Sequence, residues 1–140
     1  MRFTSVGDES GQVAPLVAIS LLGLIAITAL VVDGGVLFSA RRNLQSVADG
    51  AARAGAMVID EDGLRRSGGE MVQLDPDAAR GVVHRYLEES EFGGAADIQI
   101  DTTSVTVRLS EERPTVLLSA VGIRRFDVGA LATARPRSGG

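Results

Sequence analysis

The chain has 140 residues, a net charge of −4 and no cysteine. The lack of cysteine excludes disulfides and thiolate metal sites. A net acidic chain without a basic, aromatic-rich patch argues against nucleic-acid binding. The length leaves room for at most one small soluble domain beside any membrane segment.

The first segment whose structure can be predicted is the stretch from Val13 to Val32, which has 20 residues and no charged side chain. A helix rises about 1.5 Å per residue, so this stretch covers about 30 Å, the thickness of a bilayer's hydrocarbon core. We expect a transmembrane helix over residues 13–33, after an N-terminal tail over residues 1–12. The alternative is a helix buried in a soluble protein, but so short a chain offers little to surround it. The apolar run is also too long for a cleaved signal peptide, which predicts an uncleaved anchor.

Residues 34–59 continue the helical pattern as a juxtamembrane amphipathic helix, although the Gly34-Gly35 pair could act as a hinge. One face is polar, with Arg41, Arg42 and Asp49 among its residues. The other is a narrow stripe of small and aliphatic side chains. Such a stripe either admits a partner helix at close range or covers the chain's own domain, and the pattern favours neither. The candidate helix-packing residues are Val36, Ala40, Leu44, Val47, Ala51, Ala54 and Val58.

Asp33 stands at the end of the apolar stretch and has two interpretations. In the first, the charge has no specific role and only marks the end of the span at the water interface, as charges at span ends often do. The sharper hypothesis is a membrane-end ion pair with an arginine or a free amine in a packed helix bundle.

Residues 60–74 mix charges with glycine and are expected to form a linker. An α+β domain should follow over residues 75–135, before a flexible tail at 136–140. Asp75-Pro76 predicts the start of a helix, and later two-residue alternation predicts a three-stranded antiparallel sheet under one or two helices. Residues 114–121 fit a strand or a short helix, and the helix is favoured. The expected core is Val82, Val83, Tyr86, Leu87, Val105, Val107, Leu109, Phe126 and Val128.

The residues of catalysis and metal binding are not arranged in any recognisable pattern. His84 is the only histidine, and we expect it on the surface because it has no partner to activate. Asp60, Glu61 and Asp62 lack the glycine and the glutamate of a calcium loop, which favours a solvated linker. We therefore expect no enzymatic activity, no cofactor and no metal.

Three groups of residues together resemble a known family. Gly11-Gln12-Val13-Ala14 precedes the apolar stretch, Val31-Val32-Asp33-Gly34-Gly35 ends it, and Arg41-Arg42-Asn43-Leu44-Gln45 leads into the alanine-rich segment 48–56. This order resembles the N-terminal module of the TadE/TadG-like proteins of tight-adherence (Flp) pilus assembly.

The resemblance implies a pilin-like or minor-pilin-like protein whose partners are the lipid bilayer and other pilin-like or Tad assembly proteins. It also implies that the small domain lies outside the cytoplasm, although Arg41, Arg42 and Arg53 after the span favour the opposite orientation. Prepilins carry glutamate at the fifth position after their cleaved glycine. Counted from Gln12, that position is Leu16, so we expect residues 1–11 to be retained. The alternative function is a membrane-anchored extracellular binding module for a ligand or a cell-wall polymer.

Overall fold

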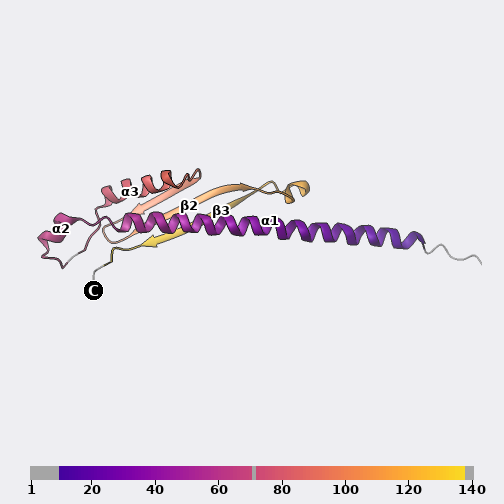
Figure 1. Ribbon diagram of the computed structural model, residues 1–140, viewed down its shortest axis with the longest axis horizontal. Coiled ribbons are helices and arrows are strands. Elements are labelled where there is room, and N and C mark those ends of the chain that lie inside the picture. The colour runs from indigo at the N-terminus through magenta and orange to yellow at the C-terminus, as the bar shows by residue number, and fades with distance from the viewer. Residues whose placement is uncertain (1–9, 71, 138–140) are drawn as a thin grey trace, which may run out of the picture.

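A computed structural model describes residues 10–70 and 72–137. Most of the expected N-terminal tail and the end of the C-terminal tail lie outside these residues. The predicted α+β class is confirmed, because a long apolar N-terminal helix leads into helices packed on a three-stranded antiparallel sheet (Figure 1). The elements are α1 (Ser10–Ala56), α2 (Glu61–Arg66), α3 (Pro76–Glu89), β1 (Ala95–Ile100), β2 (Val105–Pro114), the 3-10 helix η1 (Leu118–Val121) and β3 (Arg125–Ala134).

Helix α1 is a single helix of 47 residues that Gly34-Gly35 does not interrupt. It ends at Ala56, earlier than the expected Ile59, because the chain there turns into an isolated antiparallel bridge between Ile59 and Leu74. The backbone N–H of Asp60 donates to the carbonyl of Gln73 at 2.8 Å. The segment expected to be a linker thus contains α2 and returns the chain to the end of α1.

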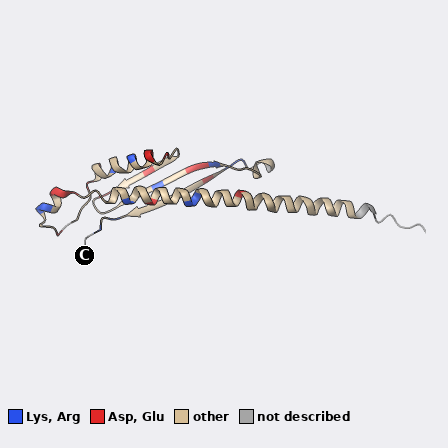
Figure 2. Ribbon diagram, in the orientation of Figure 1, with Lys and Arg blue, Asp and Glu red and all other residues tan. Residues whose placement is uncertain are grey.

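The two halves of α1 have different surroundings. The large apolar side chains from Val13 to Val32 are exposed, and Val31 is 69% exposed. Figure 2 shows that charged residues gather over the sheet domain and not on the N-terminal part of α1. The buried-helix alternative is therefore wrong for this chain, since nothing in the described residues covers the apolar half. The helix is long and apolar enough to cross a membrane.

The sheet has the order β1-β2-β3, with β2 in the centre and both pairings antiparallel. Val107 lies opposite Ile98 on one side and Ala132 on the other. Alternate residues of β2 and β3 point into one core with α3 and the second half of α1, because a strand's side chains alternate between its two faces. Of the expected core residues, Val82, Tyr86 and Phe126 are half-buried, and the buried ones are Val83, Leu87, Val105, Val107, Leu109 and Val128.

Residues 114–121 combine both of the structures considered for them. Strand β2 extends through Pro114, and the N–H of Thr115 continues the ladder by donating to the carbonyl of Arg124 at 3.0 Å. Only the last four residues form η1, which ends at Gly122 with a φ of 93°. The favoured helix was thus right for the second half of the segment and wrong for Pro114. A proline at a strand end removes no N–H that the sheet needs.

Two aspartates fix local turns in the domain. Asp75 caps α3, as predicted, by accepting from the N–H groups of Asp77 and Ala78 at 3.1 Å each. In the β1–β2 turn, the hydroxyl and N–H of Thr103, with those of Ser104, donate to Asp101 and lower its pKa to about 2. Asp101 therefore stays ionised, and holds the hairpin turn, at any pH near neutrality.

Candidate functional site

The junction between the apolar half of α1 and the sheet domain is formed by the carboxylate of Asp33. This side chain is only 2% exposed, although the apolar helical residues before it are open. It accepts hydrogen bonds from three successive backbone N–H groups, those of Val116 at 3.0 Å, Leu117 at 3.1 Å and Leu118 at 2.6 Å. These donors lie at the start of η1, so Asp33 caps it from a helix more than 80 residues earlier in the chain.

Backbone N–H groups are the hydrogen-bond partners of the Asp33 carboxylate in the described residues, and an ion pair with an arginine or a free amine of a helix bundle stays a prediction. Within residues 10–70 and 72–137, no arginine lies within salt-bridge distance of it. Three N–H groups compensate a buried carboxylate well, because hydrogen bonds to a charged acceptor contribute about 1.5–3 kcal/mol each. Asp33 therefore joins two parts of the same chain.

The seven candidate helix-packing residues do not share one environment. Leu44 and Ala51 are buried in the core against the chain's own domain, together with Ala48, Ala52 and Ala56. They are not accessible to a partner helix while the domain is folded. The others are half-buried or exposed: Ala40, Val47, Ala54 and Val58 are half-buried, and Val36 is exposed.

A groove beside Val36 remains open on α1. It is lined by Val31, Val32, Gly35, Val36, Ser39, Ala40, Asn43 and Arg113. All but the last of these residues come from α1. Small side chains at Gly35 and Ser39, one helical turn apart, leave the backbone accessible there.

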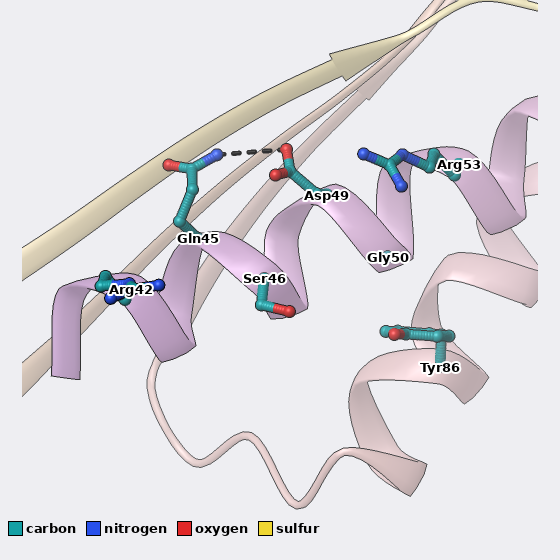
Figure 3. A pocket seen from close by; sticks show the side chains of 7 residues that line it. All are labelled: Arg42, Gln45, Ser46, Asp49, Gly50, Arg53 and Tyr86. Atoms are coloured by element: carbon teal, nitrogen blue, oxygen red, sulfur yellow. Dashed lines mark hydrogen bonds between the residues drawn. The ribbon is translucent and has the colours of Figure 1, made fainter. Parts of the chain in front are cut away.

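A second, more polar groove lies between α1 and α3 (Figure 3). Gln45 connects the α1 side of this groove to the sheet. Its side-chain amide donates to Asp49 at 3.2 Å and to the backbone carbonyl of Leu131 in β3 at 2.9 Å. The aromatic ring of Tyr86 closes the α3 side. The groove is lined by Arg42, Gln45, Ser46, Asp49, Gly50, Arg53 and Tyr86.

Two glycines of α1 permit the close packing of the domain and were not identified from the sequence. A Cβ atom on Gly50 would lie 2.0 Å from the Tyr86 hydroxyl oxygen. A Cβ on Gly55 would lie 2.7 Å from a methyl carbon of Val83 and 3.2 Å from one of Val105. Glycine is costly inside a helix, so its recurrence in an otherwise alanine-rich stretch is the signal that could have found these contacts.

The acidic and histidine residues considered for chemistry are placed on the surface. His84 is exposed on α3. Asp60 caps α2 by accepting from the N–H of Gly63 at 2.9 Å, and Glu61 pairs with Arg65 at 3.4 Å. Within the residues that the structure describes, no three histidine or acidic side chains are grouped to hold a metal ion.

Part of the chain matches a known protein family. Residues 11–58 match the family described as putative Flp pilus-assembly TadE/G-like, which confirms the resemblance found in the sequence over this part of the chain. No curated protein and no solved structure matches the chain significantly.

Proposed function

We propose, from the match of residues 11–58 to the TadE/G-like Flp pilus-assembly family, that the protein is a single-pass, non-enzymatic, pilin-like or minor-pilin-like component of a Flp/Tad-type pilus system. It would assist the assembly or the anchoring of the pilus. The observation that carries the proposal is the division of α1. Its first half exposes an apolar surface on all sides, and its second half is built into a folded domain.

The surface available to partner helices follows from this division. Leu44 and Ala51 are buried in the chain's own core, so we place the contacts with other pilin-like helices on the apolar segment 13–32 and the open groove beside Val36. Helices that meet through small residues approach closely, and Gly35, Ser39 and Ala40 provide such a surface. The groove is continuous with the apolar half because Val31 and Val32 belong to both.

We expect Val36→Arg to abolish co-purification with Tad assembly proteins from gently solubilised membranes. The added side chain would fill the groove and bring a charge into an apolar helix contact. Val36 lies outside the core cluster, so the domain should keep its circular dichroism spectrum and its unfolding temperature. The matched control is His84→Arg, which adds an arginine at an exposed position of α3 and should leave association unchanged. Equal recovery of partners by both variants would argue for the membrane-anchored binding module instead.

We also propose that residues 34–140 lie outside the cytoplasm, as the resemblance to Flp pilus-assembly proteins implies. Alkaline phosphatase fused to the C-terminus should be active, and β-galactosidase at the same position should be inactive. A fusion at Ser10, before the span, should give the reverse pattern. Active β-galactosidase at the C-terminus would overturn the proposed orientation, in agreement with the arginines that follow the span.

A further inference from the structure

The loop between β2 and β3, residues 115–124, is the part of the sheet domain that reaches furthest toward the apolar half of α1 (Figure 1). Asp33 fixes it there through the three N–H groups described above. Asp33 directly follows the apolar stretch that ends at Val32. The β2–β3 loop therefore lies beside the C-terminal end of the apolar stretch.

The β2–β3 loop has a defined shape, closed by backbone hydrogen bonds. The N–H of Thr115 donates to the carbonyl of Arg124 at 3.0 Å, and the N–H of Ile123 donates to that of Leu118 at 3.1 Å. The hydroxyl of Thr115 also donates to the carbonyl of Ile123. The backbone polar groups named here are thus paired within the loop, as burial away from water requires.

Apolar side chains on this loop are nevertheless open to solvent. Val116 is 61% exposed, Leu117 41% and Ile123 44%. Phe38 on α1 follows Asp33 by just over one turn and is exposed too, with the guanidinium of Arg42 at 5.8 Å from its ring centre. Aromatic and aliphatic side chains beside arginine are typical of the boundary between lipid tails and headgroups.

Two arginines lie at the ends of the β2–β3 loop. Arg113, just before the loop, lines the groove that Val31 and Val32 also line, and its guanidinium is ion-paired with Glu111 at 3.0 Å. Arg124 directly follows Ile123, is exposed, and has no ion pair among the residues that the structure describes. Long arginine side chains can hold their charge at the phosphate level while their stems lie along apolar surface.

We infer that the β2–β3 loop is a second membrane contact, inserted into the headgroup region of the bilayer that α1 spans. Val116, Leu117 and Ile123 enter the boundary of the lipid tails, and Arg124 binds a lipid phosphate. The inference rests on the membrane insertion in the proposed function but does not depend on pilus assembly or on orientation. Its occupant is the bilayer because the loop is held to Asp33, the residue that directly follows the apolar stretch, and because the charge of Arg124 is complementary to phosphate.

The test uses the full chain in phosphatidylethanolamine–phosphatidylglycerol vesicles. Since the protein has no cysteine, Leu117→Cys gives a single labelling site for a small fluorophore. Leu131→Cys is the matched control. Leu131 is also an exposed leucine, but Gln45 contacts its carbonyl, and Gln45 lies about 18 Å along α1 beyond Asp33. Val31→Cys reports on the span itself.

A nitroxide attached to lipid tails near the headgroup should quench the fluorescence of the label at position 117 as strongly as at position 31. It should not quench the fluorescence of the label at position 131. Aqueous iodide should show the opposite order. Val116→Cys should repeat the result at a neighbouring side chain, with the unfolding temperature of each labelled protein compared with that of the unlabelled chain.

Equal behaviour of positions 117 and 131 toward both quenchers would overturn the membrane contact while leaving the span intact. Protection of position 117 from both lipid nitroxide and iodide would also overturn it, since a protein surface would then cover the loop. Failure of lipid nitroxide to quench position 31 would refute the span, and the proposed function with it.

Discussion

Asp33→Ala is expected to separate the β2–β3 loop from α1 and to lower the free energy of unfolding of the domain by several kcal/mol, because each hydrogen bond to a charged acceptor contributes about 1.5–3 kcal/mol. The N–H groups of Val116, Leu117 and Leu118 lose their acceptor together. Hydrogen exchange at these three amides should rise most. Strand β2, held by two neighbours, should change little.

Asp33→Asn separates the hydrogen bond from the charge. The amide keeps one oxygen that can accept a hydrogen bond, but its NH2 group would face N–H donors. The free energy of unfolding of Asp33→Asn should therefore lie between those of wild type and Asp33→Ala. Asp97→Ala removes an exposed carboxylate from β1 and serves as the control. Unfolding in detergent micelles, followed by circular dichroism, measures the difference. Unchanged exchange at residues 116–118 in Asp33→Ala would show that the carboxylate does not hold the loop.

Gly55→Leu is expected to prevent cooperative folding of the domain. Even a Cβ atom at this position meets the methyl groups of Val83 and Val105, both fully buried, and a leucine adds three further carbons. Overpacking by a few carbons already costs about 1–3 kcal/mol, and a small domain has only about 5–10 kcal/mol of total stability. The stability lost by overpacking at Gly55 should therefore exceed the stability gained from the better helix propensity of leucine, which is about 1 kcal/mol.

Gly81→Leu is the matched control, because it makes the same replacement inside a helix where nothing lies within 4 Å of the added Cβ. This variant should be neutral or slightly more stable than wild type, so the same substitution has opposite signs at the two positions. Thermal unfolding of both proteins measures the effect. Membrane insertion of Gly55→Leu should persist, since residues 13–32 make no contact with Gly55. A stable Gly55→Leu domain would mean that α1 and α3 do not pack as closely as described.

The features predicted from the sequence are those that local periodicity determines. The uncharged run predicts the apolar half of α1, the Asp75-Pro76 pair predicts the start of α3, and alternation predicts the strands with Val105, Val107 and Leu109 inward. These patterns depend on neighbours within a few residues. The same reasoning gave the class of the fold and the polar face of α1.

Periodicity does not reveal which surface covers a given stripe. Leu44 and Ala51 have the spacing of a helix contact, and that spacing is the same whether the partner is another subunit or the chain's own sheet. Asp33 is a related case, because its three donors lie more than 80 residues away in a segment whose structure was itself ambiguous. Both assignments needed the tertiary arrangement.

The continuity of α1 through Gly34-Gly35 has a mechanical consequence. Because the helix enters the domain without a break and Asp33 joins it to the β2–β3 loop, we expect the apolar half of α1 and the domain to move together. Transmembrane helices tilt by about 20° on average, and Ala56 lies about 35 Å along the helix from Asp33, so such a tilt would displace the far end of the domain sideways by about 12 Å. The position of the sheet above the membrane is therefore set by the angle that neighbouring helices and lipids impose on the span.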